Sequence, residues 1–147
     1  MRITADYPPV WLAGAIAAAW GLARTVPGGI GGWAFWPGCA LVAAGLALML
    51  AAVAEMARAR TTIVPHEVPS ALVTSGVFRF TRNPIYLGDA LVLSGLILAW
   101  DVAAALPLIV LLVWVIELRF IRPEEARLRA AFGADFDRWA TRVRRWV

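Results

Sequence analysis

The sequence predicts an all-α integral membrane protein of about four transmembrane helices, with a cytoplasmic connector and a C-terminal amphipathic helix. Composition is the first observation, because 61% of the 147 residues are hydrophobic and 16% are charged. A soluble domain carries roughly 45–50% apolar and about 25% charged residues. The second observation is that the charges gather in a few segments between long apolar stretches. Lipid is therefore the predicted solvent for most of the chain.

An N-terminal pair of transmembrane helices is expected in residues 1–57, within a single structural domain. Residues 7–23 carry no charge, and two prolines near their start suit the first turn of a helix, where a missing N–H costs little. Residues 27–32 are rich in Gly and Pro and predict a turn. Residues 37–56 are dense in Ala, Leu and Gly, and such small residues let helices approach closely in lipid.

The remaining core is expected in residues 58–147. The polar stretch 58–82 shows little helical periodicity, and an ordered connector of this length in a small protein is usually functional. Two apolar stretches, 84–100 and 102–120, follow it, and only Asp101 separates them. They predict a tight helical hairpin, in which each arm is close to the lower limit of about 17 residues for crossing a bilayer.

The tail, residues 123–147, predicts one amphipathic helix. Pro123 fits the first helical position, and Glu124 and Glu125 suit the positive end of the helix dipole. Apolar residues recur at spacings of three, four and seven, and arginines occupy much of the remaining surface, so the helix is expected at the membrane interface. The apolar residues are Leu128, Phe132, Trp139, Val143 and Trp146.

The distribution of the 14 basic residues, all of them arginines, predicts the orientation. They cluster in the connector and from Arg119 onward, whereas Arg24 alone falls on the opposite side. The positive-inside rule therefore places both termini and the connector in the cytoplasm of a multi-pass protein. The absence of Lys, with abundant Ala and Arg, points to a GC-rich bacterial genome and hence to the cytoplasmic membrane. An outer aromatic belt is expected from Trp20, Trp33, Trp36 and Trp100.

The connector and the tail carry an ordered set of motifs. Residues 70–88 read SALVTSGVFRFTRNPIYLG, a Glu-Glu pair stands at positions 124 and 125, and residues 132–139 read FGADFDRW. Together they resemble the isoprenylcysteine carboxyl methyltransferase and phospholipid methyltransferase superfamily. That superfamily shows a Leu-Val-Thr-Ser-Gly-aromatic segment, Arg-His-Pro-x-Tyr, a helical hairpin, a Glu-Glu pair and Phe-Gly-x-x-Tyr-x-x-Tyr. The resemblance covers about residues 61–147.

Some positions depart from the pattern. Asn83 stands where the superfamily has His, and Phe136 and Trp139 stand in place of the two tail tyrosines. A cofactor-contacting His of the superfamily would fall at or near Ser70. Asn can still donate and accept hydrogen bonds, so cofactor binding is expected to survive. These changes bear on the substrate more than on the reaction.

The resemblance implies a methyltransferase that uses S-adenosyl-L-methionine and releases S-adenosyl-L-homocysteine. It implies that the adenosyl group is walled by Leu72, Val73 and Phe78, and that the methionine end or the ribose is held beside the Asn-Pro-x-Tyr motif. It also places either Arg119 or Arg122 against an anionic group of the substrate. The full set of cofactor-binding residues implied by the resemblance is Leu72, Val73, Phe78, Arg82, Asn83, Pro84, Tyr86, Glu124 and Glu125.

Methyl transfer from a sulfonium requires an in-line nucleophile, a held cofactor and excluded water. A carboxylate nucleophile is already ionised and needs only orientation by a forked guanidinium, which favours methyl esterification of a lipophilic or small amphiphilic substrate. An amine or thiol would need a proton acceptor, for which Asp89 and Glu117 are the candidates within the spans; either could instead be an ion-pair partner. The predicted catalytic residues are Arg119, Arg122 and Asp89.

Other functions fit the sequence less well. A non-enzymatic membrane protein that retains the methyltransferase fold is the main alternative, and binding of S-adenosylmethionine would discriminate. A small exporter would need an ionisable residue deep in an early span, and a reductase would need a Gly-rich dinucleotide fingerprint. No metal is expected, since His66 is the only His and Cys39 the only Cys. No nucleic-acid partner is expected, since no soluble basic module is left over.

Overall fold

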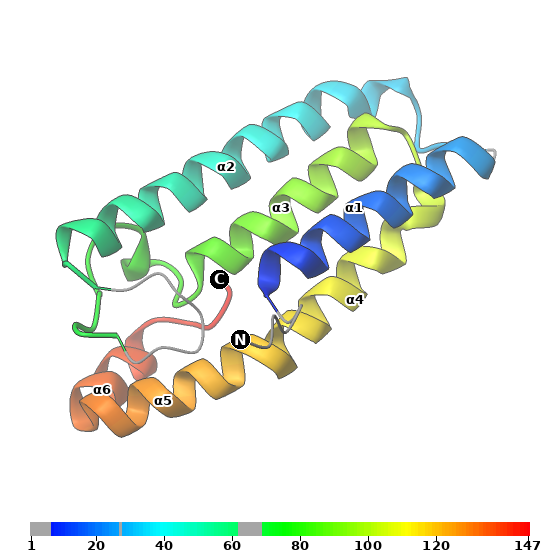
Figure 1. Ribbon diagram of the computed structural model, residues 1–147. Coiled ribbons are helices and arrows are strands. Elements are labelled where there is room, and N and C mark those ends of the chain that lie inside the picture. Colours follow the sequence, from blue (N-terminus) through cyan, green and yellow to red (C-terminus); the bar gives the residue numbers. More distant parts are fainter. Residues whose placement is uncertain (1–6, 27, 62–68) are drawn as a thin grey trace.

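Four helices run side by side in alternating directions in the computed structural model of the protein (Figure 1). They are α1 Pro8–Thr25, α2 Phe35–Arg58, α3 Pro84–Ala99 and α4 Leu106–Ile116. The structure describes residues 7–26, 28–61 and 69–147, and these ranges contain helices and no strand, which confirms the all-α prediction. Short 3-10 turns occupy Gly32–Ala34, Gly76–Arg79 and Ala103–Ala105.

Helices α2 and α3 touch through paired glycines at two levels. Gly38 of α2 lies against Gly95 of α3, and seven residues along each helix Gly45 lies against Gly88. A Cβ added to Gly38 would lie 2.6 Å from the carbonyl oxygen of Gly95, and one added to Gly45 would lie 2.8 Å from that of Gly88. The two backbones are therefore in direct contact, the approach that small residues allow between helices in lipid.

The core lies on the other side of α3, where α1 and α4 pack against it. Leu93 and Ile97 of α3, Ala19 of α1 and Ile116 of α4 are completely buried there. Phe120, just beyond α4, extends this core toward the end of the bundle that carries the connector and the tail.

Asp101 holds the two turns at the opposite end of the bundle together. It lies between α3 and α4 with a φ of +57°, and its Oδ1 accepts hydrogen bonds from the backbone N–H groups of Ile30 at 2.5 Å and Gly31 at 2.7 Å. A Cβ on Gly29 would collide with this carboxyl group, so the turn requires glycine there. The α1–α2 turn and the α3–α4 turn are thus joined by one side chain.

Two helical stretches, Gly32–Arg58 and Ala103–Phe132, are long and apolar enough to cross a membrane by length and composition. Helix α3 is apolar but shorter. Large apolar side chains point outward along both stretches, with Leu50 70%, Val110 71% and Trp114 60% exposed. Water-soluble proteins rarely expose apolar surface of this extent, whereas lipid requires it.

Aromatic side chains gather at the Asp101 end of the bundle. Trp20 and Trp100 meet edge to face with ring centroids 5.2 Å apart, while Trp33 and Trp36 are exposed. All four predicted belt tryptophans therefore lie at one end, as a membrane–water interface would require.

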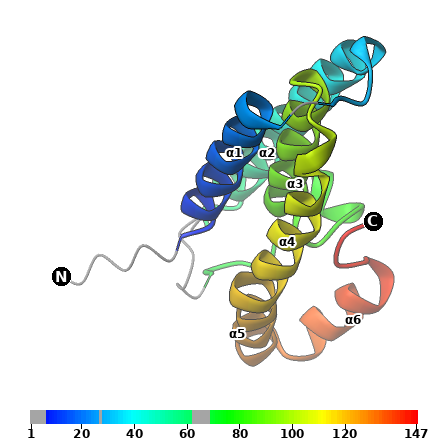
Figure 2. The same ribbon diagram turned by 90° about the vertical axis from the view of Figure 1, so that its right-hand side faces the viewer.

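Helix α4 continues without interruption into α5 Arg122–Phe132 through a π-helix, Glu117–Ile121 (Figure 2). In an uninterrupted α-helix, residues eight apart are rotated by about 80° from one another. The wider π turn changes this phase and allows Glu117 and Glu125 to face the same neighbour. Such turns are rare and frequently occur at functional sites.

The prediction of a single helix over residues 123–147 is wrong. Helix α5 ends at Phe132, α6 Ala134–Arg142 turns away from it (Figure 2), and residues 143–147 are not helical. The cause is Gly133, whose φ of +51° and ψ of −123° are disfavoured for other residues. The five apolar residues therefore do not form one stripe, and Phe136 is buried against the protein instead.

Candidate active site

The connector and the tail, some 60 residues apart in sequence, meet beneath the end of the helix bundle. The indole Nε1–H of Trp139 in α6 donates to the carbonyl oxygen of Phe78 at 3.2 Å. The backbone N–H of Arg82 donates to the carbonyl oxygen of Arg144 at 3.0 Å. The two halves of the sequence pattern therefore build one surface.

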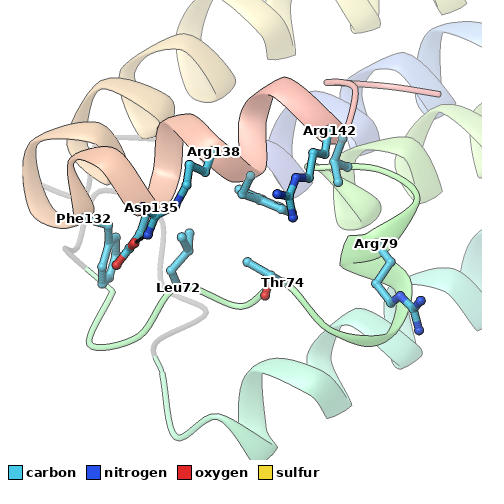
Figure 3. A pocket seen from close by; sticks show the side chains of 9 residues that line it. Leu72, Thr74, Arg79, Phe132, Asp135, Arg138 and Arg142 are labelled. Carbon is cyan, nitrogen blue, oxygen red and sulfur yellow. Dashed lines mark hydrogen bonds and ion pairs between the residues drawn. The ribbon is translucent and has the colours of Figure 1, made fainter.

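A cavity of about 770 Å³ lies between them (Figure 3). Ligand sites in proteins are usually clefts of roughly 300–1,000 Å³, so this one is large enough for a nucleoside-containing cofactor. The connector contributes Leu72, Thr74 and Arg79, and the tail contributes Phe132, Asp135, Arg138, Trp139, Arg142 and Val143.

The lining combines aromatic surface with positive charge. Trp139 packs edge to face on buried Phe136 with centroids 5.9 Å apart, which fixes its ring. Arg138 is hydrogen-bonded to Asp135, whereas Arg79 and Arg142 have no ion-pair partner among the described residues. Three guanidinium groups against one carboxylate leave the described lining positive, which suits a ligand with a flat apolar ring and an anionic group.

An ion-pair network connects the end of the connector, α5 and the last residues of the tail. Glu125, which is buried, forms an ion pair with Arg82 Nη2 at 3.1 Å and accepts hydrogen bonds from Arg145 at 2.7 and 3.1 Å. Arg145 also donates from Nη1 to Glu117 at 2.9 Å. Burial lowers the pKa of the Arg82 guanidinium, and the hydrogen bonds to Glu125 raise the pKa of Arg145. The network links the connector, α5 and the tail.

A second polar contact lies deeper, where α3 begins. The Tyr86 hydroxyl donates to Glu124 Oε2 at 3.0 Å, which ties α3 to α5. One turn further into α3, Asp89 is 3% exposed. An acidic group buried in an apolar helix of a membrane protein is a functional candidate by default.

The family-model description "Phospholipid methyltransferase" matches residues 33–135 of the chain. The chain belongs to the phospholipid methyltransferase family. Members of this family are integral membrane proteins with methyltransferase activity, and such enzymes generally use S-adenosylmethionine. The match confirms the predicted resemblance. No curated protein and no solved structure matches the chain.

The phospholipid methyltransferase match covers one wall of the cavity more fully than the other. It includes the whole connector and ends at Asp135, within the first turn of α6. Arg138, Trp139 and Arg142, which complete the tail wall, lie beyond the matched residues.

The residues that the resemblance implies for the cofactor do not form one cluster in the structure. Leu72 lines the cavity, and Phe78 is buried beside it with its carbonyl oxygen bonded to Trp139. Asn83, next to buried Pro84, donates from Nδ2 to the carbonyl oxygen of Arg145 at 2.9 Å. Arg82 and Glu125 belong to the ion-pair network, Tyr86 and Glu124 to the deeper contact, and Val73 is half-buried in the connector.

Neither predicted substrate arginine borders this cavity. The Arg119 guanidinium lies over the Trp11 ring of α1 at 5.4 Å from its centroid. Arg122 is paired with Glu117 at 3.2 Å and is largely exposed. Ser70, at the position of a cofactor-contacting His, donates to the carbonyl oxygen of Arg60 at 3.0 Å. His66 lies outside the described residues.

Sequence reasoning missed several residues of the cavity, and one signal could have found them. Asp135, Arg138, Trp139 and Arg142 recur at spacings of three, four and seven within one short helix, so they share a face. The prediction of one long interfacial helix assigns their arginines to the membrane surface instead. Thr74 and Arg79 carry no comparable spacing signal, since only the tertiary structure brings them near the tail.

Proposed function

We propose that the protein is an S-adenosylmethionine-dependent methyltransferase of the cytoplasmic membrane whose cofactor occupies the cavity between the connector and the tail. The observation that carries the proposal is that this cavity joins the two halves of the family's sequence pattern. When bound, the cofactor supplies an electrophilic methyl group on a sulfonium sulfur. The protein has to hold that group, orient the acceptor and exclude water.

The cavity residues fit such a cofactor. Trp139 and Phe132 offer aromatic surface for the adenine ring, and Leu72 offers apolar surface from the connector. Arg79 and Arg142, which have no ion-pair partner among the described residues, would hold the carboxylate of the methionine end.

The acceptor would be a lipophilic or small amphiphilic molecule that reaches the site from the bilayer. A carboxylate acceptor stays the favoured proposal, because guanidinium groups dominate the charge around the cavity and can orient it. An amine or thiol acceptor would use Asp89 as proton acceptor, since that carboxyl accepts no hydrogen bond from the described residues. Arg119 and Arg122 stay predictions as substrate anchors; full turnover in both alanine variants would remove them.

The proposed topology has four spans with the connector and the tail in the cytoplasm. Two sufficiently long apolar helices support it, as does the gathering of tryptophans at one end of the bundle. The arginines of the connector and the tail lie at the other end, as the positive-inside rule requires.

Calorimetric binding to the full chain in nanodiscs tests the proposed function. S-adenosylmethionine and S-adenosylhomocysteine are expected to bind with micromolar affinity, and NADPH is expected not to bind. Arg142→Gln should weaken binding by about tenfold through the lost charge-assisted contact. Arg144→Gln is the matched control, because Arg144 is an exposed neighbour of equal charge that does not line the cavity.

A folded protein that binds neither sulfur compound would refute the enzyme and favour the non-enzymatic alternative. One observation already gives that alternative weight, because Arg82, Asn83 and Glu125 are engaged with the protein's own tail. Micromolar binding that weakens about tenfold in Arg142→Gln and is unchanged in Arg144→Gln would leave only the acceptor to be found.

A further inference from the structure

The C-terminal segment, residues 143–147, runs alongside the start of α3 and is held there by its backbone. The carbonyl oxygen of Arg145 accepts from Thr81 Oγ1 at 3.2 Å and from Asn83 Nδ2 at 2.9 Å. One residue earlier, the carbonyl oxygen of Arg144 accepts from the backbone N–H of Arg82. The Arg-Asn-Pro motif therefore binds the tail of the same chain.

The Arg145 side chain supplies the charge that fastens this segment. Its Nε and Nη2 form a fork on the two carboxylate oxygens of Glu125 at 3.1 and 2.7 Å, and Nη1 reaches Glu117 at 2.9 Å. Trp146 adds a hydrogen bond from its indole Nε1–H to the other oxygen of Glu117 at 3.2 Å. A bidentate pair of this kind fixes direction as well as distance, which a lysine in its place would not do.

The π-helix makes this arrangement possible. Glu117 is its first residue, and Glu125 lies eight residues later in α5. Both carboxylates reach one guanidinium from the same helix. In a regular α-helix they would diverge by about 80° around the axis. The π turn thus places two carboxylates where both can bind the Arg145 guanidinium.

We propose that Arg145 is a positioning residue that fixes the tail wall of the cofactor cavity. Its guanidinium binds Glu125 and Glu117 on one side, and its carbonyl oxygen accepts from the side chains of Thr81 and Asn83 on the other. Arg142 and Val143, which line the cavity, directly precede this anchored stretch. Gly133, at the other end of α6, is a turn where an added Cβ would meet nothing within 4 Å. The Arg145 contacts therefore hold the C-terminal end of the wall, and the Trp139–Phe78 hydrogen bond holds its middle.

The proposal reassigns part of the family motif. Asn83 and Glu125 act on the cofactor through the tail, because their hydrogen bonds go to Arg145. The effect on the cofactor rests on the proposed function, whereas the attachment of the tail does not. The experiment below separates the two.

Amide hydrogen exchange of residues 134–147 in the full chain, without cofactor, measures the attachment. Arg145→Gln is expected to raise the exchange rates of this segment by about tenfold or more, because it removes the charge-assisted hydrogen bonds that Arg145 donates to Glu125 and Glu117. Arg145→Lys keeps the charge but not the fork, and should lie between Arg145→Gln and the wild type. Arg144→Gln is the matched control and should match the wild type, since the Arg144 side chain is exposed.

Calorimetry on the same variants measures the consequence for the cofactor. Arg145→Gln should weaken S-adenosylmethionine binding by at least about tenfold, and Asn83→Ala should weaken it to a similar extent. The double variant should be no weaker than the worse single one, because both changes release the same segment. Additive losses would mean that Asn83 contacts the cofactor itself, and would overturn its reassignment.

The outcomes distinguish the two proposals. Unchanged exchange in Arg145→Gln overturns the positioning role, whether or not the cofactor binds. Raised exchange with unchanged affinity overturns the link between the tail and the cavity. A wild type that binds no S-adenosylmethionine refutes the proposed function, and raised exchange in Arg145→Gln would then still establish Arg145 as the residue that attaches the tail.

Discussion

The close contact between α2 and α3 predicts that Gly→Ala lowers the stability of the protein at Gly95, which lies in the contact, and raises it at Gly14, which lies outside it. A Cβ added to Gly95 would lie 2.5 Å from the carbonyl oxygen of Gly38 and 2.7 Å from the backbone N of Val42. Both atoms belong to the backbone, so the helices must separate. Overpacking costs about 1–3 kcal/mol, and alanine recovers about 1 kcal/mol through its higher helix propensity. With the upper cost for a backbone clash, Gly95→Ala should lose about 2 kcal/mol, roughly 30-fold in the folding equilibrium.

Gly14 of α1 is the matched control, because an added Cβ there would meet no atom within 4 Å. Gly14→Ala should therefore stabilise the protein by up to about 1 kcal/mol. The assay is reversible unfolding of the full chain in detergent micelles with increasing dodecyl sulfate, followed by far-ultraviolet circular dichroism. Equal stability of the two variants, or a Gly95→Ala variant as stable as the wild type, would refute direct backbone contact between α2 and α3.

Three further predictions concern the two ends of the bundle. Asp101→Ala should destabilise the fold by about 2–4 kcal/mol in the same unfolding assay, since it removes an acceptor shared by two N–H groups, and Asp101→Asn, which keeps an acceptor oxygen, should cost clearly less. An Asp101→Ala variant as stable as the wild type would argue against this side chain as the link between the turns. Tyr86→Phe removes the donor to Glu124, one of the residues that the resemblance implies for the cofactor, and should weaken S-adenosylmethionine binding by about tenfold in calorimetry. Unchanged binding would mean that this hydrogen bond serves only to join α3 to α5. Single cysteines at Thr141 and Trp36, in a chain without the native cysteine, should be labelled from opposite sides of the membrane in oriented vesicles. Labelling of both from one side would contradict the proposed topology.

Much of the fold could be predicted from local features of the chain. Long uncharged stretches predicted helices in a lipid environment, and prolines at positions 8, 84 and 123 marked where helices begin or where α5 starts its first turn. The boundaries of α3 differ from the predicted stretch 84–100 by a single residue. In the tail, hydrophobic periodicity gave a wrong prediction. The apolar spacing continues through Gly133 in the sequence, but the helical backbone ends there.

The family could also be predicted from sequence, since its motifs are ordered residue types that need no structure to be read. The role of each motif residue could not. Asn83 is bonded to the tail, and Glu125 to Arg82 and Arg145, although the motif alone suggested contacts to a cofactor. A side chain's partner is set by what the fold brings within about 3 Å of it, and here the partners lie far away in sequence.

By itself the sequence determined the lipid environment, most of the helices and the family. Apolar composition, the prolines at helix starts and short motifs are local properties of the chain. Only the tertiary structure decided that the connector and the tail line one cavity, that Arg79 and Arg142 both border it, and that Arg145 lies between two carboxylates of the helix that contains the π turn. The cavity requires contact between residues some 60 positions apart. The position of Arg145 requires the altered rotation of side chains around the helix axis after the π turn, which no sequence pattern predicts. Charge and hydrogen bonding become a site only where the packing of helices fixes their directions.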